Sequence, residues 1–307
     1  RPYLGAFIGL LWFFMPNNLC AIFIEGNLAR SLSMIFLPVF IYSVYKYLYN
    51  HKLRYIPLMV FTFLLMELCH LGYAGMVAIA VIIYGIVYMI QKGRKKAVLD
   101  VVISMIFGFM LLGIWLVASL RGGITSLDNS ENMANFFQNL WITINPFERL
   151  TRGFEYFYFG FATLIVIVFG ILFGYKKSRT GFVTGFIILL MTTKSAYAVL
   201  KHLPGSQYLW MLRFISIALC MILMSFLMWD RLKKTLVLML CVLLVVDTIP
   251  SLSLIVGEHN DISVQERMAA RQDSTLISSA QAVTKQRLAL MDESILGATG
   301  SWLVSDY

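Results

Sequence analysis

Five ionisable side chains interrupt the long apolar runs of this sequence. In chain order they are Glu67, His70, Lys194, Arg213 and Asp247. A charged group inside the hydrocarbon of a membrane costs about 2.5–3.5 kcal/mol on insertion scales, so it marks a functional site by default. Arginine, as a bidentate fork, and lysine, as a point charge, would suit a phosphate or pyrophosphate group. Glu67 would orient His70 or pair with a cation.

Each of these side chains also has a structural interpretation. In one alternative, Arg213 and Asp247 form an ion pair between neighbouring helices, and in another Lys194 extends to the headgroups. Glu67 and His70, three positions apart, match half of a carboxylate-bridged metal site. The chain contains no second pair of this kind. We therefore expect no metal site.

The composition indicates which elements must position these groups. Of 307 residues, 59% are hydrophobic and 13% charged, and the mean hydropathy is +0.78. Soluble domains have about 45–50% apolar and about 25% charged residues, so an all-α, multi-pass membrane protein is expected. The net charge of +9 comes from short basic clusters between apolar runs, a pattern that excludes a nucleic-acid groove. The four cysteines lie in apolar runs without CxxC spacing, which argues against disulfides and zinc.

A helical span needs about 20 apolar residues, and the sequence predicts nine transmembrane helices. The third predicted helix is short, so we expect it to be tilted or partly re-entrant. Its neighbour follows across the turn at Leu71-Gly72, and Pro16-Asn17-Asn18 should break the first span. The predicted spans are Leu4–Ile24, Ala29–Tyr45, Ile56–His70, Tyr73–Ile90, Leu99–Leu120, Phe154–Gly174, Gly181–Leu200, Tyr208–Trp229 and Thr235–Val256.

The distribution of basic residues predicts the orientation of these spans. If they alternate, the connections on one side contain thirteen lysines and arginines and those on the other side five. The positive-inside rule places the basic side in the cytoplasm, so the amino end is cytoplasmic and the carboxyl end is outside. All five ionisable residues then lie in the outer half of the membrane. This asymmetry favours a cavity open to the outer leaflet, because an ion pathway would place charges in both halves.

Three segments fall on the predicted outer side. The first is the turn at residues 25–30, which contains Glu25 and Arg30. The second is the loop at residues 121–153, where apolar residues at helical spacing predict an amphipathic surface helix, with an ordinary ordered loop as the alternative. The third is the polar tail at residues 257–307, expected to begin an extracytoplasmic region after a transmembrane domain at residues 1–256. Because the chain begins with Arg1, we interpret it as an internal fragment.

Several short motifs together resemble a family of bacterial membrane proteins related to 6-pyruvoyl-tetrahydropterin synthase. That family is in turn distantly similar to the C-type (GT-C) membrane glycosyltransferases. The resemblance covers most of the chain. Its motifs are Pro16-Asn17-Asn18, Glu25-Gly26-Asn27-Leu28-Ala29-Arg30-Ser31-Leu32, Pro38, Cys69-His70-Leu71-Gly72-Tyr73-Ala74-Gly75, Leu203-Pro204-Gly205, Met211-Leu212-Arg213-Phe214 and Asp247-Thr248-Ile249-Pro250-Ser251-Leu252.

The resemblance implies glycosyl transfer from a polyprenyl-phosphate-linked sugar at the outer face of the bacterial inner membrane, among membrane lipids. It leaves the cofactor open and allows a divalent cation. The signature acidic residue that follows the first span of C-type enzymes is not recognisable in this chain. The residues expected to bind the substrate are Arg30, Lys194, Arg213 and Asp247. The candidates near the sugar or the acceptor, where a carboxylate base is needed, are Glu25, Glu67 and His70.

Two other functions remain open from the sequence. A lipid or polysaccharide transporter would use the same outer cavity, and discontinuous spans are typical of transporters. A non-catalytic scaffold would bind partners through the region after Gly257. Pterin synthase activity is not expected, because that chemistry requires clustered zinc-binding histidines. The four histidines of this chain, His51, His70, His202 and His259, are scattered.

Overall fold

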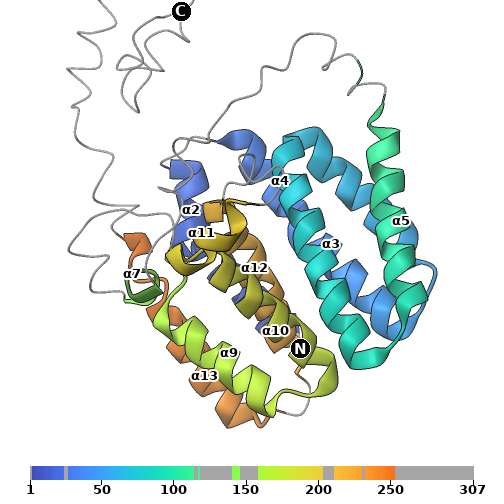
Figure 1. Cartoon of the computed structure of the whole chain (residues 1–307). Coiled ribbons are helices and arrows are strands. Elements are labelled where there is room, and N and C mark those ends of the chain that lie inside the picture. Colours follow the sequence, from blue (N-terminus) through green and yellow to red (C-terminus); the bar gives the residue numbers. More distant parts are fainter. Residues whose placement is uncertain are drawn as a thin grey trace, which may run out of the picture.

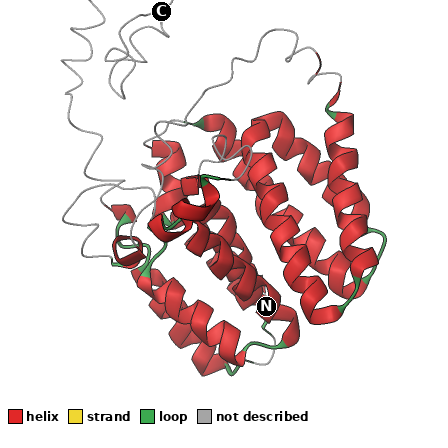
Figure 2. Ribbon diagram, viewed as in Figure 1, coloured by secondary structure: helices red, strands yellow, loops and turns green. Residues whose placement is uncertain are grey.

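The computed structural model describes residues 2–23, 27–113, 117, 140–145, 158–202, 211–229 and 232–252. Within these ranges every regular element is an α-helix (Figure 2). Glu25, most of the 121–153 loop and the 257–307 tail lie outside the described residues, so the predictions made for them stay predictions. The helices are α1 (Pro2–Phe14), α2 (Pro16–Phe23), α3 (Leu28–Asn50), α4 (Tyr55–Lys92), α5 (Lys95–Leu111), α7 (Leu140–Ile144), α9 (Phe161–Phe173), α10 (Lys176–Met191), α11 (Lys194–Leu200), α12 (Met211–Leu227) and α13 (Lys234–Val246).

Helix α12 forms the centre of the bundle. Of its seventeen residues, fifteen are buried, and it packs against α1, α2, α3, α4 and α10. A helix that is apolar on all sides is stable only when other helices surround it. In Figure 1, α5 and the α9–α13 pair lie on opposite sides of this centre. Large apolar side chains remain exposed on the outer helices, including Ile35 (62%) and Leu172 (65%), as expected for surfaces that contact lipid rather than water.

The first apolar segment is broken at Pro16, as the sequence predicts. Helices α1 and α2 meet at an angle of 57°, because proline lacks the amide hydrogen that would continue the helical ladder. The carbonyl of Trp12 loses its ordinary partner there, and the side-chain amide of Asn18 donates a hydrogen bond to it instead. The Trp12 carbonyl, which the break leaves without its helical donor, thus has a partner within the protein. Any helix break at membrane depth requires such a partner.

Helix α4 folds back on itself at His70. A straight helix of 38 residues would be about 57 Å long, yet both of its ends lie beside the last turns of α3. The rings of Tyr55 and Tyr42 are 6.3 Å apart, and the hydroxyl of Tyr88 donates to the carbonyl of Leu48 at 2.6 Å. His70 has non-helical angles (φ −155°, ψ 93°). The two arms, residues 55–69 and 71–92, match the third and fourth predicted segments.

The structure does not support nine complete membrane spans. Among the described residues, α3 and α4 are long and apolar enough to cross a membrane, and the bent α1–α2 pair makes a third. Helices α9 and α13 have 13 residues each, or roughly 20 Å at 1.5 Å per residue, which is short of the hydrocarbon thickness. The predicted span Gly181–Leu200 is divided between α10 and α11. The predicted bounds differ from the helices in both directions: α3 (Leu28–Asn50) is longer than the predicted span Ala29–Tyr45, whereas α13 (Lys234–Val246) ends before the predicted Val256.

The basic connections of the chain meet at one end of the bundle. The hydroxyl of Thr180, near the start of α10, contacts the hydroxyl of Tyr49 at 2.6 Å and donates to Gln91 at 2.7 Å. The ring of Trp229, after α12, packs on that of Phe182 at 5.8 Å. These contacts unite four connections that are far apart in sequence. Their described basic residues are Lys46, Lys52, Arg54, Lys92, Arg94, Lys95, Lys96, Lys176, Lys177, Arg179, Lys233 and Lys234.

Candidate functional site

A cluster of buried and half-buried polar side chains lies at the end of the bundle opposite the basic connections. It forms where α2, the start of α3, the fold-back of α4 and the start of α12 converge. We call it the polar cluster. Its members are Asn17, Arg30, His70, Tyr73, Arg213 and Ser216. Of the seven sequence candidates, Arg30, His70 and Arg213 belong to it, and Glu67 is buried one helical turn before His70 on α4.

Arg30 enters the cluster from the first turn of α3. Its backbone amide donates to the side chain of Asn27 at 2.9 Å, which caps the helix and fixes where this turn begins. The guanidinium is fully buried. It donates to the amide oxygen of Asn17 at 3.4 Å and lies over the ring of Tyr73, 5.9 Å from the centroid. A buried cation is thereby held by an amide and an aromatic face.

His70 and Arg213 face each other across α4 and α12. The backbone amide of Tyr73 donates to Nδ1 of His70 at 3.1 Å, so the imidazole caps the second arm of α4. A neutral imidazole has only one acceptor nitrogen, which places the proton on Nε2. That Nε2 lies 3.3 Å from Nη1 of Arg213, which is also a donor. Two donors therefore converge, and an oxygen between them could accept a hydrogen bond from each. We call this arrangement the donor fork.

A hydrogen-bond chain behind the donor fork fixes α12 against α4. The hydroxyl of Ser216 donates to the carbonyl of Arg213 at 2.8 Å, and the hydroxyl of Tyr73 lies 2.8 Å from Ser216 Oγ. Because the Ser216 proton is committed, Tyr73 is the donor in this second bond. The side-chain amide of Asn17 also donates to the carbonyl of Leu212 at 3.1 Å. These contacts set the rotation of α12 and hence the direction of the Arg213 side chain.

The hydrogen bond from the Tyr73 hydroxyl to Ser216 should contribute modestly to the stability of the protein. We expect Tyr73→Phe to lower the free energy of unfolding by about 1 kcal/mol, because one buried hydrogen bond is lost while Ser216 keeps its own acceptor. Thermal unfolding in detergent measures the effect. Tyr73→Leu, which also removes the ring beside Arg30, should cost clearly more. Equal stability of both variants with the wild type would contradict this role.

Glu67 lies one helical turn before His70 and is 2% exposed. Its Oε2 has no hydrogen-bond partner among the residues that the structure describes. The nearest part of α5 is Gly108, where the position of a Cβ would be 3.8 Å from this oxygen. Burying a polar group without a partner is unfavourable. No hydrogen bond to Oε2 therefore offsets the cost of burying this carboxyl among the described residues.

Asp247 lies outside the polar cluster, at the amino end of α9. Its carboxylate accepts hydrogen bonds from the amides of Ala162 at 3.0 Å and Thr163 at 2.6 Å and from the hydroxyl of Thr163 at 2.7 Å. It thus caps the amino end of α9, where the helix dipole favours an anion. The ion pair with Arg213, one of the two sequence interpretations, is not formed by these contacts. The sequence gives no signal for this cap, because its partner is 84 residues away.

The remaining sequence candidates lie outside the polar cluster. Lys194 is exposed at the start of α11, as its headgroup interpretation would require, and Glu25 is not among the described residues. Three members were not predicted as binding residues: Asn17, Tyr73 and Ser216. Asn17 and Tyr73 belong to motifs that the sequence singled out, whereas Ser216 carries no sequence signal. The described part of the chain contains no group of three or more His, Cys, Asp or Glu residues able to hold a metal.

Comparison with known proteins identifies the family of this chain. No curated protein and no solved structure matches the chain. A sequence model of the 6-pyruvoyl-tetrahydropterin synthase related domain, described as a membrane protein, matches residues 1–255. This match covers all but the last residue of the predicted 1–256 domain, and the chain therefore belongs to the family of membrane proteins with a 6-pyruvoyl-tetrahydropterin synthase related domain.

Proposed function

We propose that this chain is the membrane-embedded part of a glycosyltransferase of the C type, which transfers a sugar from a polyprenyl-phosphate carrier. The observation that carries the proposal is the donor fork of His70 and Arg213. Two N–H groups from different helices, 3.3 Å apart, suit an oxyanion such as a phosphate. The buried guanidinium of Arg30, linked to the same region through Asn17 and Tyr73, supplies further positive charge.

The location of the polar cluster supports transfer at the outer face of the bacterial inner membrane. The four basic connections gather at one end of the bundle, and the positive-inside rule assigns that end to the cytoplasm. The polar cluster lies at the opposite end. A lipid phosphate in the outer leaflet would reach this depth without crossing the hydrocarbon. In this orientation the amino end of the chain is cytoplasmic.

The proposed reaction assigns one role to each group. The donor fork and Arg30 bind the phosphate, which leaves with the electron pair of the bond to the anomeric carbon of the sugar. The acceptor hydroxyl attacks that carbon and forms the new glycosidic bond. Glu67 accepts the proton of the hydroxyl, as a general base in such a step must. Its position one turn before His70 places it on the same arm of α4.

Replacement of Glu67 tests this assignment. In the full-length protein in native membranes, we expect Glu67→Gln to lower sugar transfer from a labelled polyprenyl-phosphate sugar about 100-fold or more. Binding of the carrier should stay within about twofold, because the donor fork is intact. Glu67→Asp, which keeps the carboxylate but shortens the side chain, should retain part of the activity. Undiminished transfer by Glu67→Gln would exclude Glu67 as the base.

A lipid transporter is the second candidate, and the broken α1–α2 segment favours it. Only the transferase would form a covalent product, the glycosylated acceptor. A transporter would move the labelled lipid between leaflets of proteoliposomes without forming a new glycosidic bond. Detection of a glycosylated acceptor excludes transport as the sole activity, whereas lipid movement without such a product excludes the transferase.

A further inference from the structure

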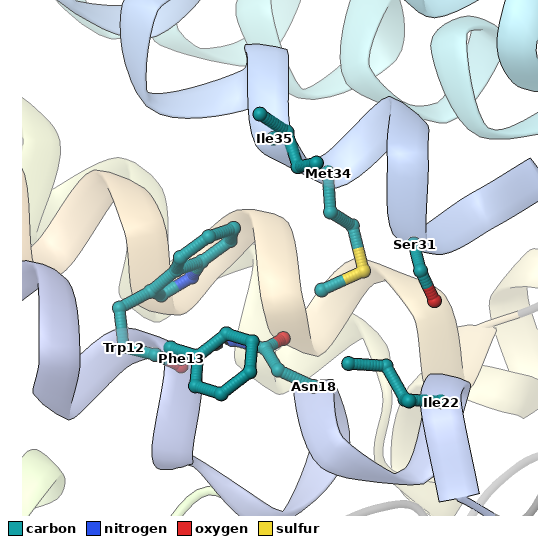
Figure 3. A pocket seen from close by; sticks show the side chains of 7 residues that line it. All are labelled: Trp12, Phe13, Asn18, Ile22, Ser31, Met34 and Ile35. Carbon is teal, nitrogen blue, oxygen red and sulfur yellow. Dashed lines mark hydrogen bonds between the residues drawn. The ribbon is translucent and has the colours of Figure 1, made fainter. Parts of the chain in front are cut away.

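A small groove lies between α1, α2 and the first turns of α3. Its volume is about 60 Å³, and Figure 3 shows the side chains around it. The apolar lining comes from Trp12, Phe13, Ile22, Met34 and Ile35. The groove follows from the break at Pro16, since the 57° turn of α2 away from α1 leaves a wedge that α3 does not fill.

One polar atom inside this groove lacks a partner. Asn18 is 1% exposed, and its side-chain nitrogen is committed to the carbonyl of Trp12. This bond fixes the orientation of the amide, so the atom facing the groove is the oxygen Oδ1, as Figure 3 shows. Among the described residues, Oδ1 has no hydrogen-bond donor. Ser31, the other polar residue of the lining, donates its proton to the carbonyl of Asn27 at 2.9 Å.

The surroundings of the groove restrict what could satisfy this oxygen. Phe13 (43% exposed), Ile22 (40%) and Ile35 (62%) form its rim, and exposed apolar side chains of this kind contact lipid chains. Hydrocarbon offers no donor. A buried water molecule typically makes about three hydrogen bonds, and this lining has only two polar side chains among the described residues, Asn18 and Ser31. A mainly apolar molecule with one donor therefore suits this groove best.

We propose that the groove binds a hydroxyl-bearing membrane lipid, with the hydroxyl donating to Asn18 Oδ1. The volume suits the hydroxyl and the first carbons next to it, while the rest of the chain lies on the apolar rim among the surrounding lipids. This site is separate from the donor fork. Asn17 faces Arg30 and α12, whereas the adjacent Asn18 faces the groove. The proposal stands whether or not the chain transfers sugars.

The fluorescence of Trp12 reports on occupancy, because its indole lines the groove. The full chain is reconstituted in phosphatidylcholine nanodiscs and titrated with brominated stearyl alcohol, whose bromines quench nearby indoles. The matched probe is the methyl ether of the same alcohol, which keeps the chain and loses the donor. We expect the alcohol to bind about tenfold more tightly than the ether. The Trp12→Phe variant identifies the part of the signal that comes from the groove.

Three variants test the site itself. Asn18→Leu should bring the alcohol-to-ether ratio to about 1, since leucine has a similar shape and no acceptor. Ile22→Phe should weaken both probes several-fold by filling the groove, whereas Leu32→Phe, at a residue of similar exposure (42%) outside the lining, should not. If Asn18→Leu fails to fold, the alcohol-to-ether affinity ratio of the wild type and the binding of both probes to Ile22→Phe still test the proposal. Equal binding of alcohol and ether, or binding unaffected by Ile22→Phe, would overturn the proposal.

Discussion

Replacing Arg213 by alanine is expected to reduce sugar transfer by the full-length protein by about 100-fold or more. The loss has the size seen when a preorganised donor to a developing anion is removed. Arg213→Lys should recover only part of the rate, because an ammonium cannot form the bidentate contact of a guanidinium. The initial rate of transfer and the affinity for polyprenyl phosphate, both measured in membranes, check this expectation.

Replacing His70 separates the loss of a donor from the loss of stability better than replacing Arg213 does. In His70→Asn, the asparagine oxygen can still accept the hydrogen bond from the Tyr73 amide, so the cap of the second α4 arm is kept while the Nε2 donor is lost. We expect this variant to unfold at the temperature of the wild type and to transfer sugar about as slowly as Arg213→Ala. The double variant should be little worse than either single one, because both act on one bound oxygen. Wild-type rates in both single variants would remove the donor fork from the mechanism.

Replacing Gly160 is expected to have the largest effect on folding. A Cβ at this position would lie 2.0 Å from the Asp247 carboxyl carbon, and the backbone there has a φ of +95°, which residues other than glycine rarely adopt. Gly160→Ala must therefore displace the carboxylate that caps α9. We expect a loss of about 3 kcal/mol or more in the free energy of unfolding, from the freed α9 amides and the backbone strain.

Two further variants separate the cap from the strain at Gly160. Asp247→Ala leaves the backbone free to adopt its native angles and should still destabilise the protein by about 3 kcal/mol, because two buried amides lose their acceptor. Gly75→Ala is the matched control, since a Cβ at Gly75 meets nothing within 4 Å and alanine favours a helix. The fraction of monodisperse protein after heating in detergent measures all three. Stable Gly160→Ala and Asp247→Ala variants would show that Asp247 does not carry the packing of α9.

Asp247 also illustrates how a charged residue in an apolar run can have a structural purpose. Its three shortest hydrogen bonds all go to the start of α9, so α13 and α9 are joined near their ends by a buried anion and a helix terminus. Glu67, the other buried carboxyl of the described residues, has no such partner for Oε2. The two carboxyls therefore differ in their hydrogen bonding, although the sequence presents both within apolar runs.

The amino-acid sequence by itself determined the class of the protein and several features of its path. The excess of apolar residues indicates a helical membrane protein, and the family match agrees. Pro16 predicts the broken first segment, since proline removes a backbone donor wherever it stands. The two arms of α4 follow from the polar interruption at Cys69-His70-Leu71-Gly72. The basic connections could also be grouped from their sequence positions alone. Each of these properties depends on residues close together in the chain.

Only the tertiary structure decided which polar groups meet. Hydrophobicity gives the cost of burying each charge, but the partner depends on how far each helix is rotated and shifted against its neighbours, and packing over the whole bundle sets those two quantities. Arg213 lies 143 positions from His70, and Asp247 lies 84 from Thr163. The sequence therefore allowed an ion pair between Arg213 and Asp247. In the packed bundle, the Arg213 side chain instead lies beside His70, and the Asp247 side chain lies at the amino end of α9.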